Sequence, residues 1–275
     1  MNKKIKLILE GIRIQNVVIA LFCCFVAINK IGVFEFNVAI LSVVIVVSLM
    51  MAANLANDVY DVHTDSINCP SRPLIIEPSM IVFFKRLVVF FCLISIVLSF
   101  FLNLKSQLII IFSIPVLVFY SKLFKPIPLI GNIIVALYLS LVFIFIEVSI
   151  TGYLSKMVIP SIFAFGISLI RELLKDVEDF IGDKKTGLKT VPVVFGIINA
   201  IYIGCFFIML FCLQCFIIIL DSNIYSVMAI IFLVFLPLFY LIFLLLENPS
   251  IKSCKEGSFL LKKITIAGLL IIYII

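Results

Sequence analysis

Nine long stretches of this chain consist almost entirely of apolar side chains, and no other feature limits its possible folds as strongly. The chain is 64% hydrophobic, well above the usual share of a soluble domain, so these stretches cannot all be covered by one another. A helix of about 20 apolar residues crosses the hydrocarbon core of a bilayer. We therefore predict an all-α, polytopic membrane protein with about nine transmembrane helices. The predicted spans are Val17–Ile31, Val38–Ala56, Ile81–Leu102, Leu108–Phe119, Leu129–Ile150, Val158–Leu174, Pro192–Leu220, Ile224–Leu246 and Phe259–Ile275.

Lys and Arg are distributed unevenly among the segments that join these spans. If the N-terminus lies in the cytoplasm, fifteen of the 21 basic residues fall in cytoplasmic segments and three in the opposite loops. Cytoplasmic loops of membrane proteins retain Lys and Arg, so the bias supports this orientation. We predict a protein of the cell membrane whose second and sixth spans end on the cytoplasmic side.

Two polar clusters lie at those two helix ends. Residues 57–65 and 171–183 together hold eight of the fifteen carboxylates. An ionised carboxylate is costly beside lipid, so two such clusters indicate a bound cation. Members that are four residues apart share one face of a helix, and each cluster is therefore expected to form a stripe along a helix that continues from a span. The first stripe is Asn57, Asp61 and Asp65, and the second stripe is Arg171, Lys175, Asp179 and Asp183.

The two stripes are related by a constant offset of 118 residues, from Asn57 to Lys175 and from Asp65 to Asp183, which indicates a weak internal duplication. Adjacent carboxylates repel each other unless a cation lies between them. A set of Asp and Asn oxygens favours Mg²⁺ over softer metals. Mg²⁺ is usually bound by one or two carboxylates together with phosphate oxygens of the substrate. We therefore predict a phosphate or diphosphate substrate at the membrane surface, and no nucleic-acid partner.

At these residues the chain resembles the UbiA-type intramembrane prenyltransferases. That family carries an N-x-x-x-D-x-x-x-D motif and an aspartate-rich D-x-x-x-D stretch preceded by Y/R-x-x-x-K, and the two stripes match them. The loop N-x-P-x-R-P-L of the family is similar to residues 68–74, and its G-x-x-T-x-P ending is similar to residues 187–192. Further agreement comes from Arg13-x-x-Asn16, Tyr120-Ser121-Lys122, Lys125 and Gly131-Asn132.

The resemblance implies one integral-membrane prenyltransferase domain over residues 1–275, with helices around a central cavity in which Mg²⁺ holds the diphosphate of a polyprenyl donor. The active site would face the cytoplasm. The catalytic residues implied are Asp61, Asp65, Asp179, Asp183 and Lys175. The metal ligands implied are Asn57, Asp58, Asp61, Asp65, Asp176, Asp179 and Asp183. The substrate-binding residues implied are Asn57, Arg72, Arg13, Asn16, Tyr120, Lys122, Lys125 and Arg171.

The acceptor is harder to predict, because members of the family share the metal motifs and differ in the acceptor pocket. The run from Arg171 to Pro192 is most similar to the branch that transfers geranylgeranyl to geranylgeranylglyceryl phosphate in membrane lipid biosynthesis. Such an acceptor brings a phosphate of its own, which suits the many cationic side chains. The alternative is an aromatic acceptor of the 4-hydroxybenzoate type, as in quinone biosynthesis. Heme farnesylation fits the second stripe less well.

Ion-coupled transporters form a second class with intramembrane acids. A transporter would place the acids at mid-membrane on helices broken by Gly or Pro, whereas these stripes end spans and lead into basic loops. A non-catalytic scaffold would need neither stripe. Of the other polar residues, His63 is expected at the surface, and Cys212 and Cys215 are expected to behave as small apolar side chains. Glu147, near the non-cytoplasmic end of a span, has no role in this interpretation.

Overall fold

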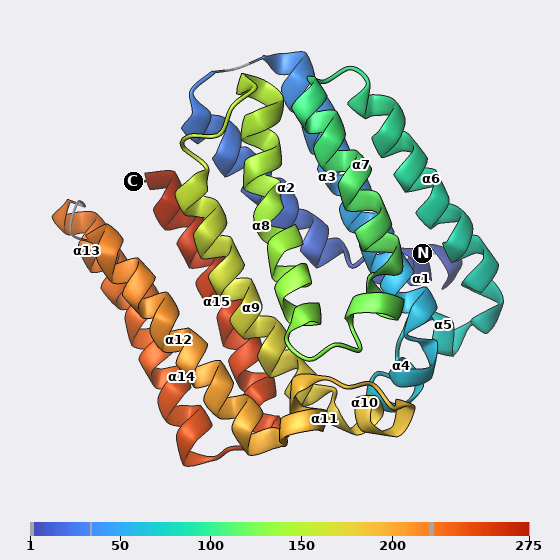
Figure 1. Ribbon diagram of the computed structural model, residues 1–275, viewed down its shortest axis with the longest axis vertical. Helices are drawn as coiled ribbons and strands as arrows, with labels where there is room; N and C mark the ends of the chain where they lie inside the picture. Colours follow the sequence, from blue (N-terminus) through green and yellow to red (C-terminus); the bar gives the residue numbers. More distant parts are fainter. Residues whose placement is uncertain (1–2, 34, 220–222, 275) are drawn as a thin grey trace. The chain divides into compact units, whose positions relative to one another are not determined.

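The computed structural model describes residues 3–33, 35–219 and 223–274, and within these ranges it contains helices and loops but no strand (Figure 1). The predicted all-α class is confirmed. Helices are the expected outcome for long apolar runs in lipid, because a helix satisfies its backbone N–H and C=O groups internally. Leu220 and Ile275, the predicted ends of two spans, lie outside the described residues.

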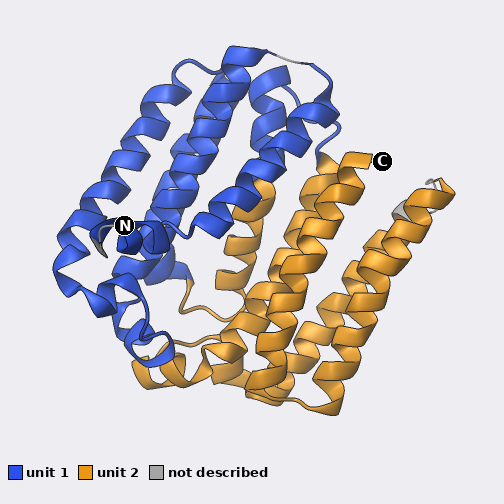
Figure 2. Cartoon of the chain, turned by 180° about the vertical axis from the view of Figure 1, so that it is seen from behind, with its two compact units in different colours: residues 1–124, 142–157 blue, residues 125–141, 158–275 orange. Residues whose placement is uncertain are grey.

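The chain divides into two compact units (Figure 2). Unit 1 comprises Met1–Phe124 and Val142–Met157, and unit 2 comprises Lys125–Leu141 and Val158–Ile275. Helix α8 (Ile130–Thr151) is shared, because its first half belongs to unit 2 and its second half to unit 1. The first stripe lies in unit 1 and the second stripe in unit 2, so each stripe belongs to a unit of its own.

Unit 1 is organised around its longest helix, α3, which packs against α2, α6 and α7. Ala52 and Leu55 of α3 and Phe84 of α6 are fully buried at this core. The first stripe is therefore attached to a helix that three neighbours hold in place. The described helices that lie wholly in unit 1 are α1 (Lys3–Gly11), α2 (Ile14–Ile31), α3 (Phe36–Tyr60), α4 (Val62–Asn68), α5 (Pro73–Ile76), η1 (Pro78–Met80), α6 (Ile81–Ser99), α7 (Leu104–Phe119) and the π-helical turn η2 (Tyr120–Phe124).

Unit 2 is organised around α9, which packs against α12 and α15, and α14 packs against the same two helices (Figure 1). Ile170 and Leu174 of α9, Ile201 of α12 and Leu261 of α15 are fully buried between these helices. The second stripe begins on α9 and is supported in the same manner as the first. The other described helices of unit 2 are α10 (Phe180–Thr186), α11 (Val191–Phe195), α12 (Ile197–Ile219), α13 (Ile224–Ile230), the π-helical turn η3 (Ile231–Phe235), α14 (Leu236–Glu247) and α15 (Ile251–Ile274), with α9 at Val158–Glu178.

Eight helices within the described ranges are long and apolar enough to cross a membrane. The sixth predicted span, Val158–Leu174, is not among these eight but is present as α9, which has 21 residues and carries charged side chains in its last two turns. The fourth span is longer than predicted, because the helix begins at Leu104 and continues through η2 to Phe124. The polytopic architecture is confirmed, and the count of nine holds only if the charged end of α9 lies beyond the apolar layer.

The bounds of the helices repeat along the chain. α4 and α10 begin and end 118 residues apart, and α3 and α9 also end 118 residues apart, at Tyr60 and Glu178. The short helices α5 and α11 follow, and both have a proline in their first two positions. A long helix then follows in each case, α6 in unit 1 and α12 in unit 2. The offset between the stripes thus extends to the helices around them, as an internal duplication predicts.

Candidate active site

The first stripe lies where α3 ends and α4 begins. Asp61 separates the two helices with φ −90° and ψ 9°, yet its backbone N–H still donates to the carbonyl oxygen of Asn57 at 2.8 Å. The backbone N–H of Asp65 donates to the carbonyl oxygen of Asp61 at 2.7 Å. Because helical hydrogen bonds continue through the break, the three side chains remain one turn apart.

The second stripe repeats this geometry where α9 ends and α10 begins. Asp179 has φ −86° and ψ 1°, and its backbone N–H donates to the carbonyl oxygen of Lys175 at 3.0 Å. The backbone N–H of Asp183 donates to the carbonyl oxygen of Asp179, also at 3.0 Å. We predicted that each stripe lies on a continuous helix, and this was wrong at Asp61 and Asp179. A ψ angle near 0° ends one helix there and starts the next, while the spacing is kept.

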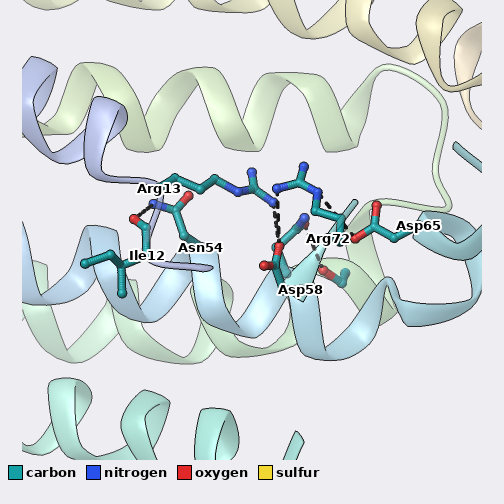
Figure 3. A network of polar contacts seen from close by, with 8 residues as sticks. Ile12, Arg13, Asn54, Asp58, Asp65 and Arg72 are labelled. Atoms are coloured by element: carbon teal, nitrogen blue, oxygen red, sulfur yellow. Dashed lines mark hydrogen bonds and ion pairs between the residues drawn. The ribbon is translucent and has the colours of Figure 1, made fainter. Parts of the chain in front are cut away.

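Beside the first stripe, one buried carboxylate holds two arginines (Figure 3). Oδ1 of Asp58 accepts a hydrogen bond from Nη2 of Arg13 at 2.8 Å and lies 3.7 Å from Nη1 of Arg72. Nε of Arg72 lies 3.8 Å from Oδ2 of Asp65. The Asp58 side chain is 1% exposed, whereas Arg13 and Arg72 keep 18% and 23% exposure. The structure therefore brings four predicted site residues into one polar network whose cations still reach solvent.

Arg13 has an unusual backbone in the break between α1 and α2. Its φ of 53° and ψ of 64° are left-handed, which costs about 1–3 kcal/mol for a residue other than glycine. The carbonyl oxygen of Ile12 in this break accepts a hydrogen bond from Nδ2 of Asn54 at 2.9 Å. A Cβ on Gly11 would lie 2.7 Å from the ring of Phe84, so glycine is needed for this close approach to α6. The break is thus fixed by contacts with α3 and α6.

The carboxyl group of Asp65 has an elevated pKa. The pKa of Asp65 is raised to about 6, chiefly by burial and also by the neighbouring charges of Asp61 and Asp58, while Arg72 and Arg13 oppose the shift. The pKa of Arg72 is also raised, since the attraction of Asp58 and Asp65 outweighs the effect of its burial. A carboxylate that is difficult to ionise in this way gains stability when a cation binds it.

Unit 2 holds its own set of polar contacts beside the second stripe. Nδ2 of Asn132, in the first turn of α8, donates to Oδ2 of Asp176 at 2.8 Å, and Lys125 interacts electrostatically with the same carboxylate. Nη1 of Arg171 donates to Oε1 of Glu172 at 2.9 Å. The prediction named Asp176, Lys125 and Arg171 as site residues but not Asn132. The available signal for Asn132 was the Gly131-Asn132 pair, which agreed with the family pattern.

The remaining predicted site residues of unit 1 contribute unequally. Oγ of Ser121 lies 3.5 Å from Oδ1 of Asn57, so the turn η2 reaches the first stripe. Tyr120 in the same turn is half-buried, whereas Lys122 is exposed. Asn16, in the first turn of α2, is half-buried, and its backbone N–H donates to the carbonyl oxygen of Arg13 at 2.8 Å.

The donor atoms of both stripes suit Mg²⁺. Within the described ranges, no three His, Cys, Asp or Glu side chains lie close enough to hold a metal ion by themselves. Mg²⁺ does not require such a group, because it commonly binds one or two carboxylates and completes its shell with substrate phosphates and water. The first stripe provides two carboxylates and an amide oxygen, and Oδ2 of Asp65 is buried with no hydrogen-bond donor among the described residues. These residues therefore fit a magnesium ion shared with a phosphate.

Glu147 has a structural role that the sequence did not suggest. Its buried carboxylate, in α8, accepts hydrogen bonds from the backbone N–H groups of Ser155, Lys156 and Met157 at 2.9, 2.8 and 3.0 Å. Nζ of Lys156 in turn donates to the carbonyl oxygen of Ile31 at 2.8 Å. Glu147 therefore anchors a loop of unit 1 to the end of α2. The available signal for this role was the position of Glu147, an acid shortly before a turn at Gly152.

His63 is exposed, as predicted. Cys212 and Cys215 are buried thiols on α12, and Cys24, Cys92, Cys205 and Cys254 are also buried. They form part of the apolar packing of their helices, which agrees with the prediction for thiols in apolar spans.

Comparison with known proteins identifies the family. Residues 16–262 match the sequence profile of the UbiA prenyltransferase family. The chain is 30% identical over 236 residues to digeranylgeranylglyceryl phosphate synthase of Methanosphaera stadtmanae, covering 81% of this chain and 80% of that protein. It is 28% identical to the enzyme of the same name from Sulfurisphaera tokodaii, over 98% of this chain and 97% of that protein. The chain belongs to the UbiA prenyltransferase family and is an integral membrane prenyltransferase.

Solved structures agree with this assignment. A structure of digeranylgeranylglyceryl phosphate synthase has a TM-score of 0.76 and 27% sequence identity, and covers 99% of this chain and 98% of that one. A UbiA homologue from Archaeoglobus fulgidus bound to DMAPP and Mg²⁺ has a TM-score of 0.68 at 19% identity, over 98% of this chain and 99% of that one. At that identity the second similarity establishes the fold alone.

Proposed function

We propose that this protein transfers a geranylgeranyl group from geranylgeranyl diphosphate to geranylgeranylglyceryl phosphate, with Mg²⁺ as its cofactor. The observation that carries the proposal is the pair of stripes, each interrupted at its middle aspartate and each attached to a well-packed helix. Relatives named digeranylgeranylglyceryl phosphate synthase support this acceptor. Homologues bound to prenyl diphosphates and Mg²⁺ support this type of donor and this metal.

The reaction breaks the C–O bond between the prenyl group and the diphosphate, which leaves with the electron pair. The acceptor hydroxyl oxygen forms an ether bond to the same carbon and releases its proton. Asp61 and Asp65 in unit 1, and Asp179 and Asp183 in unit 2, would each hold Mg²⁺, which would neutralise charge on the diphosphate. Lys175 donates hydrogen bonds to diphosphate oxygens and its charge stabilises the leaving group, and Arg72 donates hydrogen bonds to phosphoryl oxygens of a substrate.

The other predicted residues have supporting roles in this proposal. Asn57 and Asp176 add oxygen ligands to the first and second stripe, respectively. Ser121, which reaches Asn57, and Asn132, which reaches Asp176, orient these two ligands. The residues proposed to contact the donor or the acceptor are Arg13, Asn16, Tyr120, Lys122, Lys125 and Arg171.

We further propose that residues 1–275 act as one prenyltransferase domain whose active site is open to the cytoplasm. The family profile spans residues 16–262, which include parts of both units, and this supports a single functional domain. Basic residues follow each stripe, with Arg72 after the first and Lys184 and Lys185 after the second. Cytoplasmic segments retain such residues, which supports the proposed orientation.

The decisive experiment uses the purified protein in liposomes with geranylgeranyl diphosphate and a panel of acceptors. Diphosphate release and product mass are measured with Mg²⁺ and again with EDTA. The proposal predicts an ether product with geranylgeranylglyceryl phosphate, formed only with the metal, and formed about 10²–10³-fold more slowly by the Asp61→Asn variant. A product with 4-hydroxybenzoate alone would replace this acceptor by the aromatic one. Absence of turnover with every acceptor would contradict the prenyl-transfer proposal.

A further inference from the structure

We propose that Asn54 and Asp58 are positioning residues that fix Arg13 beside Arg72, so that the two guanidinium groups together bind a phosphoryl group of a substrate. The inference rests on the proposed function, because the phosphoryl group belongs to the donor or to the acceptor. It assigns a role to Asn54, which lies in no motif, and a role other than metal binding to Asp58.

The first step of the argument is the backbone of Arg13. A left-handed conformation is unfavourable for arginine and persists only where surrounding contacts hold it. The carbonyl oxygen of Ile12 has lost its helical partner at the break, and Nδ2 of Asn54 supplies the replacement at 2.9 Å. Asn54 is itself 7% exposed, so this hydrogen bond is protected from water. Asn54 therefore holds the backbone from which the Arg13 side chain extends.

The second step is the side chain of Arg13. Asp58 is four residues after Asn54, one turn further along the same face of α3. Its Oδ1 atom receives Nη2 of Arg13 at 2.8 Å, and Nη1 of Arg72 lies 3.7 Å from the same atom. One helix thus controls both the backbone and the guanidinium of Arg13 (Figure 3).

The third step is the unused hydrogen-bonding capacity of Arg13. Its Nε is buried and has no hydrogen-bond partner within the described part of the chain. A buried guanidinium N–H requires an acceptor, and phosphoryl oxygens are the acceptors that paired arginines bind best. Asp58 carries one negative charge beside two arginines and is already engaged by both of them. Oδ1 makes both of these contacts and assigns Asp58 to the arginines, whereas Oδ2 has no hydrogen-bond partner among the described residues. The Mg²⁺ requirement of an Asp58 variant therefore tests whether this carboxylate also binds a metal ion.

Chemical labelling tests this arrangement without relying on turnover. Phenylglyoxal modifies arginine more readily when a neighbouring carboxylate no longer stabilises the charged form, and mass spectrometry reports each site separately. Relative to the wild type, the modification rate of Arg13 should rise about tenfold in Asn54→Ala and in Asp58→Asn. The exposed Arg86 is the internal reference, and Asn29→Ala, which removes an exposed amide of α2, is the matched control. Unchanged labelling of Arg13 in both variants would overturn the proposal.

Protection from labelling identifies the source of the phosphoryl group. Inorganic pyrophosphate represents the donor diphosphate, and glycerol 1-phosphate represents the head of the acceptor. Protection of Arg13 by pyrophosphate alone assigns the pair to the donor, and protection by glycerol phosphate alone assigns it to the acceptor. If neither protects Arg13, the phosphoryl site is contradicted even where the labelling rates change. These results remain interpretable if no acceptor supports prenyl transfer.

Kinetics on the same variants separate positioning from metal binding. Asn54→Ala and Asp58→Asn should raise the KM of the substrate that protects Arg13 by about tenfold, with little change in kcat. Neither substitution should have a further effect in an Arg13→Ala background, because residues that act through one side chain are not additive. The Mg²⁺ concentration for half-maximal rate should stay the same in Asp58→Asn. A raised Mg²⁺ requirement, or independent effects in the double variants, would overturn the assignment. Asp58→Asn keeps the shape of the side chain and carries the test if Asn54→Ala does not fold.

Discussion

The two stripes share a backbone and differ in their surroundings. Asp61 and Asp179 interrupt the two helices with nearly the same φ and ψ angles, and α4 and α10 have equal lengths. Asp58 and Asp176 directly follow the corresponding positions Asn57 and Lys175, and these two carboxylates are held differently. Two arginines hold Asp58, whereas the neutral amide of Asn132 holds Asp176.

This difference shows how each stripe obtains its positive charge. The first stripe begins with an amide, Asn57, and its cations come from outside, from the break before α2 and from the loop before α5. The second stripe carries its cation within itself, since Lys175 occupies the position that corresponds to Asn57. Thr190, at the start of α11, stands 118 residues after Arg72, so the position that corresponds to Arg72 is uncharged in unit 2. Duplicated backbones thus support unequal electrostatics, which suits the recognition of an asymmetric substrate.

A further common feature lies at the start of α2 and α8, the helices that come before the stripe-bearing helices α3 and α9. Arg13 and Leu129 are the two residues other than glycine with positive φ in the described part of the chain, and they directly precede α2 and α8. In each unit, this helix start supplies a side chain that contacts an aspartate, Arg13 itself with Asp58 in unit 1 and Asn132 with Asp176 in unit 2. The same backbone device therefore positions a charged group in one unit and a neutral group in the other.

Both stripes are expected to be essential. Asp61→Asn and Asp179→Asn should each lower kcat/KM for prenyl transfer by about 10²–10³-fold, because each removes a fixed charge from a preorganised site. Steady-state kinetics on folded protein measures the effect, and Glu256→Gln, on the exposed face of α15, is the control that should keep full activity. Nearly normal activity in either aspartate variant would contradict the prediction that both stripes are needed for prenyl transfer.

Loss of Asp58 in unit 1 should be more damaging than loss of Asp176 in unit 2. Asp58→Asn leaves two arginines without their carboxylate and should lower the free energy of unfolding by about 2–3 kcal/mol, since both arginines keep some exposure. Asp176→Asn weakens one hydrogen bond with a neutral amide and should cost about 1 kcal/mol. Thermal unfolding in the same detergent compares the two variants. Equal losses would mean that the arginines do not depend on Asp58.

A buried carboxylate outside the stripes provides the contrast for these effects. Glu147→Gln should destabilise unit 1 by about 1–2 kcal/mol, because the backbone N–H groups use both carboxylate oxygens and an amide replaces one of these acceptors by a donating NH2 group. The KM values of both substrates and the Mg²⁺ requirement should be unchanged in the folded variant. A changed Mg²⁺ requirement would give Glu147 a place in the site.

The sequence was sufficient for the fold class and for the spacing of the stripes, because both follow from local patterns. Apolar runs longer than a bilayer thickness have few alternatives to membrane helices, and positions four apart stay together even across the break at Asp61. The break itself was not predictable, since neither proline nor glycine marks it. It depends on the backbone angles of one aspartate.

The contacts of the site were less predictable, because they join residues distant in sequence. Arg13 and Asp58 are 45 residues apart, and their pairing depends on how α2 packs against α3. Glu147 seemed unexplained because its partners are backbone N–H groups, which no motif records. Asn54 carried no signal for the same reason, since its amide donates to a backbone oxygen.

The smallest predicted effect is a pH dependence that belongs to the first stripe. Asp65, with a pKa of about 6, must lose its proton before it can bind a metal ion, so protons compete with the metal below that pH. The apparent Kd for Mg²⁺, measured without any diphosphate present, should rise about tenfold per pH unit below pH 6 and level off above pH 7. Asp65→Asn should remove this inflection, whereas Asp183→Asn should leave it in place while weakening metal binding. An inflection that instead follows Asp183 would assign the titrating group to the second stripe.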